Sequence, residues 1–154
     1  PDVKNAFLET VADSGKTISE EDALEAARQS DGYPYMVQLV GYYMWQSAQC
    51  RGSNVIIADD VTTGVSDALL AFDDAVCVPA LDGTTSAERL FLTAMAEDSP
   101  NPTQVGDIVD RTCRSRSWVS KYRAILIKDK LIRPAGHGRL EFAVPHLGQY
   151  LQSL

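Results

Sequence analysis

The sequence has 154 residues, of which 45% are hydrophobic, so it is long enough for one average domain or two small ones with a buried core. Its three cysteines (Cys50, Cys77, Cys113) are far apart and odd in number, which excludes a disulfide framework or a zinc ribbon and favours reduced thiols in a cytoplasmic protein. No stretch approaches the roughly 18 apolar residues of a membrane span, and no secretory signal opens the chain, so we expect no membrane partner. Because the chain starts at Pro1 without a methionine, we expect a piece of a longer protein.

Apolar residues at helical spacing predict helices over residues 3–12, 20–28, 34–49 and from Asp59 or Asp60 to about residue 77. Ser19 and Pro34 mark two of the starts, because a serine side chain caps the first backbone N–H groups and proline suits the first helical position. The third helix is apolar almost all round, so we expect it to be buried. Residues 55–57 indicate a brief extended piece. The proline, aspartate and glycine of residues 79–84 indicate a linker, so we place a helical bundle at residues 1–78.

The second half has the pattern of a winged helix-turn-helix, which we place at residues 85–154. Thr85, followed three residues later by Glu88, predicts a capped helix, and a second helix follows a proline-rich loop. A short turn then leads into a basic helix, and two strands around Gly136-His137-Gly138 form a hairpin wing before a last short helix. We therefore expect a mainly α protein, with a small helical bundle followed by a winged helix-turn-helix with a short β-hairpin.

Charge is distributed unevenly along the chain. Residues 1–110 carry 5 basic and 19 acidic side chains, a net charge of −14, whereas residues 111–154 carry 9 basic and 2 acidic, a net charge of +7. Such asymmetry is typical of a local electrostatic contact. We expect double-stranded DNA as the partner, contacted from the basic helix, its N-terminal turn and the wing. The candidate DNA-binding residues are Arg114, Arg116, Ser117, Lys121, Lys128 and Arg139.

At about 100° per residue, Ser117, Lys121, Ala124 and Lys128 share one side of the basic helix, opposite Val119 and Leu126. Trp118 and Tyr122 have the chemistry to stack on bases, but at this spacing aromatic residues more often belong to the core. Two alternatives stay open for the basic side: a solvated surface, or a surface that docks on the acidic half or on another protein.

Two strings suggest a nucleotide-hydrolysing enzyme but lack the context that such sites need. Ser14-Gly15-Lys16-Thr17 matches the end of a P-loop, yet Thr10 stands where the first glycine is required, and a helical pattern precedes it instead of a strand. The second string is the acidic run Asp59-Asp60 that follows the apolar residues 55–58, and it is better explained as a helix cap. His137 and His146 have no carboxylate or cysteine at ligand spacing, so we expect exposed turn and cap positions and no metal site. No catalytic constellation appears, so we expect no enzyme activity from this chain alone.

The stretch DGYPYMVQLVGYYMW at Asp31, with the acidic helix after it and the stretch TSAERLFLTAMAEDS at Thr85, resembles the C-terminal part of bacterial AAA+ ATPases related to the origin-recognition and signal-transducing NTPase branches. In those proteins a P-loop ATPase core is followed by a helical lid and then a winged helix. The resemblance covers essentially the whole chain. It implies that Gly32, Tyr33 and Pro34 form the glycine-x-proline element that lies against the bound nucleotide. The sensor arginine of many relatives is missing, because residues 31–49 contain no basic side chain.

The resemblance implies the C-terminal regulatory and DNA-binding portion of an AAA+ type ATP-binding protein. ATP and magnesium belong to the missing core, so we expect no cofactor in this chain. Its expected partners are double-stranded DNA and the ATPase core of its own parent chain, and a homo-oligomer stays open. The runner-up is a winged-helix module that docks on protein and does not bind DNA. A third alternative is a free-standing transcriptional regulator whose acidic half dimerises or senses a ligand.

Overall fold

The computed structural model describes residues 2–154 and divides the chain into two compact units, the first ending at Phe72 and the second comprising Asp73–Leu154. Helices make up most of both units, and the strands are short, which confirms the expected mainly α class with a small β-hairpin. Within residues 2–154, no helix combines the length and the apolar character needed to cross a membrane.

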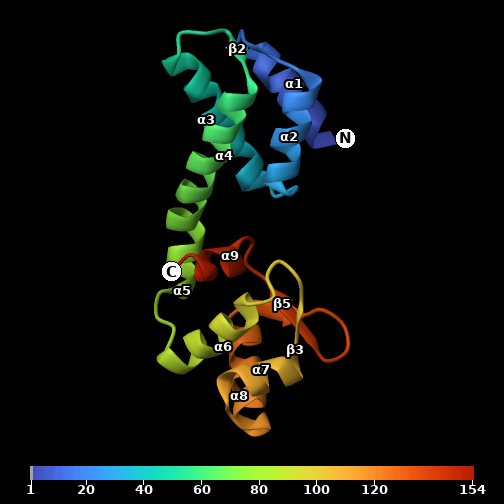
Figure 1. Ribbon diagram of the computed structural model, residues 1–154, viewed down its shortest axis with the longest axis vertical. Helices are drawn as coiled ribbons and strands as arrows, with labels where there is room; N and C mark the ends of the chain where they lie inside the picture. The colour runs from blue at the N-terminus through green and yellow to red at the C-terminus, as the bar shows by residue number, and fades with distance from the viewer. Residues whose placement is uncertain (1) are drawn as a thin grey trace. The chain divides into compact units, whose positions relative to one another are not determined.

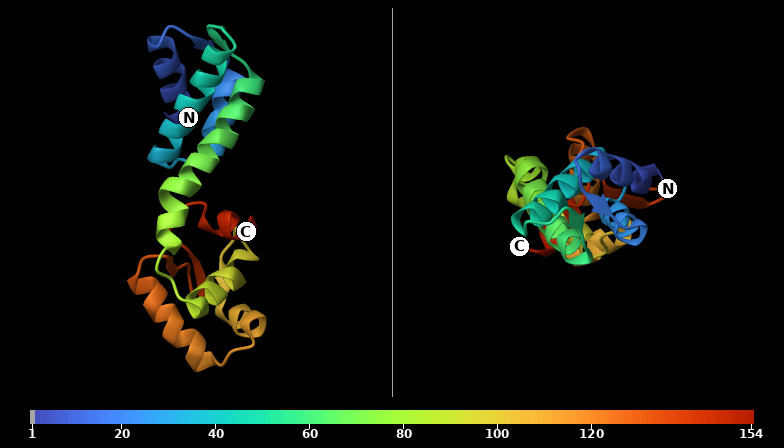
Figure 2. Two further views of the ribbon diagram at one scale, coloured as in Figure 1. Left: turned by 90° about the vertical axis from the view of Figure 1, so that its left-hand side faces the viewer. Right: turned by 90° about the horizontal axis from the view of Figure 1, so that it is seen from above.

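Helices and one short pair of strands build the first unit (Figure 1). Their bounds are α1 Asp2–Asp13, β1 Thr17–Ile18, α2 Glu20–Ser30, α3 Pro34–Cys50, β2 Val55–Ile56 and α4 Ala58–Phe72. The Ser19 hydroxyl accepts a hydrogen bond from the backbone N–H of Asp22 at 3.1 Å, and Pro34 occupies the first turn of α3. Both predicted helix starts are therefore confirmed. Helices α3 and α4 pack against each other and lie side by side in Figure 1 and in the left view of Figure 2.

The connection between α1 and α2 pairs with the connection between α3 and α4. Strands β1 and β2 run parallel, with Thr17 opposite Val55 and Ile18 opposite Ile56. The sequence predicts the extended piece at β2 but not its partner, since two residues are too few to show an alternating pattern. This pairing ties the two helical hairpins of the unit together at one end.

Helix α3 is buried on one face only, so the expectation that it is buried all round is wrong. Its buried residues recur every four positions and comprise Met36, Val40, Met44 and Ala48. Tyr42, by contrast, is 58% exposed. A tyrosine counts as apolar in a sequence pattern, yet its hydroxyl is readily hydrated, so a tyrosine-rich helix can keep one face in water.

The second unit contains a π-helix, several α-helices and a three-stranded antiparallel sheet (Figure 1). Its bounds are η1 Asp73–Cys77, α5 Val78–Leu81, α6 Ser86–Ala96, β3 Thr103–Gln104, α7 Val105–Thr112, α8 Arg116–Lys128, β4 Ile132–Pro134, β5 Arg139–Phe142 and α9 Leu147–Gln152. The strand order is β3-β5-β4, with Leu140 of β5 opposite both Thr103 and Pro134. Fully buried side chains from α6, α7, α8 and the sheet form the core of this unit.

The predicted linker at residues 79–84 lies inside the second unit. Helix α4 ends at Phe72, five residues before the predicted end, and η1 and α5 continue helical structure to Leu81, which is buried. Pro79 falls in the first turn of α5, where a proline's missing N–H costs no hydrogen bond, so it does not end the helical structure. Along the chain, the boundary between the two compact units therefore lies between Phe72 and Asp73, not at residues 79–84.

Candidate nucleic-acid interface

The start of α8 is defined by a short turn and a serine cap. Cys113 follows α7 in the left-handed conformation, with φ of 53°, and redirects the chain. The Ser115 hydroxyl then accepts a hydrogen bond from the backbone N–H of Trp118 at 3.1 Å, as the N-cap of α8. Val119 and Leu126 are fully buried and attach one side of the helix to the core. The opposite side of α8 therefore faces solvent.

All six predicted DNA-binding residues are exposed. Five of them lie on α8 or in the turn before it, and we call these five the basic face: Arg114, Arg116, Ser117, Lys121 and Lys128. The sixth, Arg139, begins β5 in the hairpin and pairs in register with Gln104 of β3. The exposure that the helical wheel predicts for Ser117, Lys121 and Lys128 is confirmed. Whether these residues bind DNA stays a prediction.

The positive charge of the basic face is not neutralised within the second unit. Among the described residues, neither the arginines and lysines of the basic face nor Arg139 form an ion pair. Two neighbouring arginines behave differently: Arg111 pairs with Asp98 at 2.8 Å, and Arg133 pairs with Glu141 at 3.0 Å. The second unit thus contains both ion-paired arginines and exposed cations that form no ion pair with any described residue.

Two aromatic rings support the cations of the basic face. Trp118 and Tyr122 are half-buried, with their ring centroids 4.7 Å apart, and Trp118 also packs against the buried Phe91 at 6.3 Å. The Arg114 guanidinium lies 5.7 Å from the Trp118 ring centroid, and the Lys121 ammonium lies 5.3 Å from that of Tyr122. Such contacts hold cationic side chains over ring faces. These rings therefore place Arg114 and Lys121 at the surface.

Two exposed residues next to the basic face were not among the predicted ones. Ser120 is exposed on α8, and a helical wheel places it only about 60° from Ser117, so the sequence contained the signal. Lys130 is exposed just beyond the end of α8, with φ of 62°. No sequence pattern indicates that position, because the turn geometry after the helix determines where Lys130 points.

The predicted nucleotide-contacting residues Gly32, Tyr33 and Pro34 lie in the first unit, at the start of α3, and all three are exposed. Gly32 has φ of 73°, a conformation that favours glycine, and Tyr33 precedes the helix in extended conformation. They share no element with the basic face.

Lys16, the lysine of the P-loop-like string, is only 3% exposed. Its ammonium donates hydrogen bonds to Oε1 of Gln49 and to the backbone oxygen of Ser53, both at 2.8 Å. The ammonium is therefore directed into the protein, and α1 precedes it where a P-loop requires a strand.

The histidines differ from each other. His137 is exposed in the hairpin turn, as expected, but the expectation that His146 is exposed is wrong. His146 is half-buried at the start of α9, with Nε2 3.6 Å from Oδ1 of Asp73. Sequence spacing cannot reveal this pair, because folding alone brings the two residues together. In the part of the chain that the structure describes, no cluster of three or more histidine, cysteine or acidic side chains is arranged to hold a metal ion.

Comparisons with known proteins bear mainly on the second unit. A search of curated proteins found no match. A family model matches residues 74–151, a range that begins one residue after the start of the second unit and includes α8, the hairpin and α9. Since this match spans about half of the 154 residues, the chain belongs to the family described as Domain of unknown function (DUF8462).

Proposed function

We propose that the second unit is a winged helix that binds double-stranded DNA, with α8 in the major groove and the hairpin beside it. The proposal rests mainly on the exposed cations of α8, its N-terminal turn and the start of β5, which have no carboxylate partner among residues 2–154. A protein that neutralises phosphates with such residues gains affinity by releasing counterions. The residues in the middle of the face are small or flexible, with Ser117, Ser120 and Ala124 beside Lys121, so the helix backbone can approach the base edges.

The N-terminal end of α8 is expected to meet the phosphate backbone. Arg114 and Arg116 flank the Ser115 cap, and the helix dipole adds partial positive charge at the same end. The first turn of α8 contains no acidic residue that would repel a phosphate. Arg139, at the hairpin, is assigned to an adjacent groove or phosphate.

The first unit, in the same proposal, is the helical lid of an AAA+ type ATPase. This assignment rests on the resemblance of the whole chain, and the exposure of Gly32, Tyr33 and Pro34 supports it, because a nucleotide-contacting element must be accessible to the preceding core. ATP and magnesium are assigned to that core, whose nucleotide state moves the lid. The lid assignment is tested by sequencing the reading frame upstream of Pro1. A P-loop and an acidic strand end encoded there would support the assignment, and a reading frame without them would contradict it.

The DNA-binding proposal is tested by fluorescence anisotropy with a mixed-sequence duplex at about 50 and about 200 mM salt. We expect saturable binding that weakens with a log–log slope of about −0.9 for each neutralised phosphate. The variant Lys121→Glu with Lys128→Glu should abolish most of the affinity. The matched control, Lys4→Glu with Arg28→Glu, changes the net charge equally but in the first unit, where both cations already pair with glutamates.

Absence of binding at the lower salt would overturn the proposal and favour the runner-up, a winged-helix module that docks on a protein. An equal loss of affinity in both double variants would also contradict it, because binding would then follow the total charge and not the basic face.

A further inference from the structure

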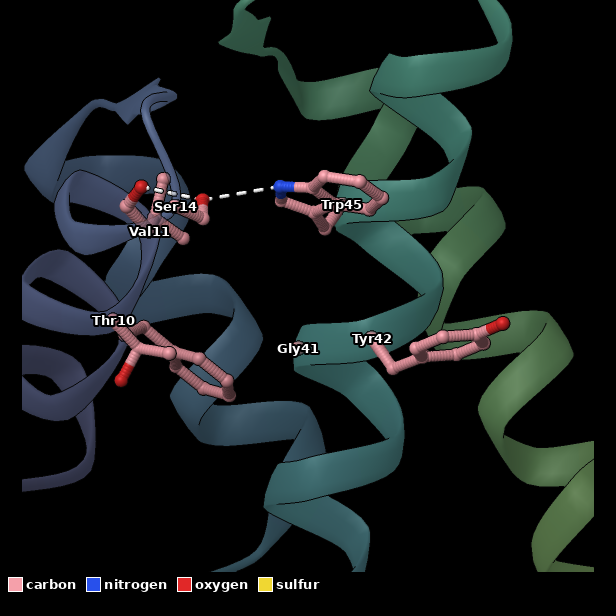
Figure 3. Close-up of a pocket in the computed structure, with 7 residues that line it drawn as sticks. Thr10, Val11, Ser14, Gly41, Tyr42 and Trp45 are labelled. Atoms are coloured by element: carbon pink, nitrogen blue, oxygen red, sulfur yellow. Dashed lines mark hydrogen bonds between the residues drawn. The ribbon is translucent and has the colours of Figure 1, made fainter.

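An apolar pocket of about 220 Å³ lies between α1 and α3 in the first unit (Figure 3). Helix α1 contributes Phe7, Thr10 and Val11 to its lining, and α3 contributes Gly41 and Trp45. The basic face and the hairpin contribute nothing to it. The pocket is therefore a feature that the proposed DNA-binding function does not use.

Missing side-chain volume on α3 keeps this pocket open. Gly41 faces α1 without a side chain, and a Cβ built there would meet the ring of Phe7 at 3.4 Å, which is still ordinary contact. The neighbouring Tyr42 extends its ring away from α1 (Figure 3). Neither residue fills the space between the helices.

One wall of the pocket is held rigid before any ligand arrives. The indole N–H of Trp45 donates to the Ser14 hydroxyl at 3.0 Å, and that hydroxyl donates to the backbone oxygen of Val11 at 2.7 Å (Figure 3). The Lys16 ammonium lies 5.0 Å from the Trp45 ring centroid and is itself fixed by two hydrogen bonds. A ligand would therefore not need to order this ring, which lowers the entropic cost of binding.

The chemistry of the walls restricts the ligand to uncharged, apolar molecules. Residues 34–50, which form α3, include no charged side chain. The Trp45 N–H already donates its hydrogen bond to the Ser14 hydroxyl, so a ligand does not need to supply a hydrogen-bond partner for it. An apolar cavity of about 150 Å³ is large enough to hold benzene, so a pocket of about 220 Å³ accommodates one substituted ring.

We propose that this pocket binds a small uncharged molecule built on a single apolar ring. The hydrophobic transfer of the ring from water onto Phe7, Val11 and Trp45 supplies the affinity. The site belongs wholly to the first unit, so it stands whether or not the second unit binds DNA.

The test is a titration of the ¹⁵N-labelled 154-residue chain with toluene, followed by two-dimensional NMR. The chain has two tryptophans, and Trp118→Phe identifies the indole N–H signal of Trp45. We expect the signals of Trp45 and the Gly41 amide to shift along a saturating curve, while the Trp118 indole signal stays in place. Benzoate, which adds a charge to the same ring, should leave all of these signals unchanged.

A filled pocket provides the matched variant. Gly41→Leu projects a side chain toward Phe7 and should weaken toluene binding by at least about tenfold. Gly106→Leu makes the same substitution in α7, where a Cβ meets nothing within 4 Å, and should bind toluene like the unmodified chain. A Trp45 shift in the unmodified chain that grows linearly to the solubility limit of toluene overturns the proposal, even if Gly41→Leu fails to fold. Equal saturable shifts in a folded Gly41→Leu variant overturn it as well.

Discussion

The carboxylate of Asp98 accepts two hydrogen bonds from the guanidinium of Arg111, with Nη1–Oδ2 at 2.8 Å and Nη2–Oδ1 at 3.0 Å. Arg111 also donates to the backbone oxygen of Ala94 at 2.9 Å and pairs with Glu97 at 3.0 Å. One arginine of α7 therefore fastens the C-terminal end of α6 and the loop that follows. Because these hydrogen bonds stabilise the ionised carboxyl, they hold the pKa of Asp98 below its ordinary value.

This pair predicts an acid-sensitive contribution to stability. The folded-state pKa of Asp98 is lowered, so the contribution is fully present above the unfolded-state pKa and is lost as the pH falls through the folded-state pKa. Asp98→Asn should lower the free energy of unfolding by about 1–2 kcal/mol near neutral pH. The difference from the unmodified chain should shrink between about pH 5 and pH 2. Urea unfolding at several pH values measures this difference in the free energy of unfolding, and Asp110→Asn, at an exposed position, is the control. A difference that does not change with pH would contradict the role given to the Asp98–Arg111 pair.

Asp59 and Asp60 are adjacent acids with opposite expected effects. Asp60 is buried and accepts hydrogen bonds from the Ile57 N–H at 3.0 Å and the Ser47 hydroxyl at 2.8 Å, besides its ion pair with Arg51. Burial alone would raise the pKa of Asp60, but these donors together lower it. Asp60→Ala should destabilise the first unit by about 2–3 kcal/mol, because the buried donors lose their acceptor. Asp59→Ala, at an exposed position, should change stability by less than about 0.5 kcal/mol. Thermal unfolding compares the stability of the two variants directly. Similar losses of stability in both would contradict the role assigned to Asp60.

At Gly64 the backbone of α4 packs closely against Met44 of α3. A Cβ at this position would lie 2.5 Å from the backbone nitrogen of Met44, and backbone cannot move aside as a flexible side chain can. Gly64→Ala should therefore cost about 1–3 kcal/mol or more through overpacking. Gly41→Ala meets only the Phe7 ring at 3.4 Å, so its gain in helix propensity should leave stability unchanged or higher. Denaturant titrations that rank the two alanine variants the other way would refute this account of the contact.

The three cysteines should differ in reactivity. Cys50 and Cys113 are exposed, whereas Cys77 is fully buried, with its thiol 3.9 Å from the backbone oxygen of Pro145. Burial, with a smaller effect of Asp73, raises the pKa of the Cys77 thiol to about 12, so almost no thiolate forms near neutral pH. N-ethylmaleimide should modify two thiols rapidly and Cys77 only after unfolding. Peptide mass spectrometry identifies the modified sites, and rapid labelling of Cys77 in the folded chain would disprove its burial.

Two arginines of the hairpin should contribute unequally to DNA binding. Arg139 has no carboxylate partner among residues 2–154, while Arg133 pairs with Glu141 at 3.0 Å. Arg139→Ala should weaken binding to all duplexes and reduce the salt slope by about 1. Arg133→Ala should have a smaller effect, since its charge is already compensated. Anisotropy titrations at several salt concentrations separate the two, and an unchanged slope for Arg139→Ala would remove the hairpin from the interface.

Much of the helical framework was predictable because it depends on neighbours in the chain. The caps at Ser19 and Thr85 each satisfy a backbone N–H three residues ahead, so a short string of residues contains both partners. The exposed side of α8 followed from the same local periodicity. By contrast, α3 was expected to be buried all round, because periodicity cannot tell which of its apolar faces another helix will cover.

The sequence by itself determined the helix starts at Ser19, Pro34 and Thr85, the mainly α class and the segregation of basic residues into the last third of the chain, since these depend on composition and on residues within a turn of one another. Only the tertiary structure decided which cations are free for a partner. Arg111 and Arg133 look like Arg116 and Arg139 in the sequence, but folding brings carboxylates to the first two and not, within residues 2–154, to the others. The pocket beside Gly41 and the burial of Lys16 are of the same kind, because each depends on contacts between segments that are distant along the chain.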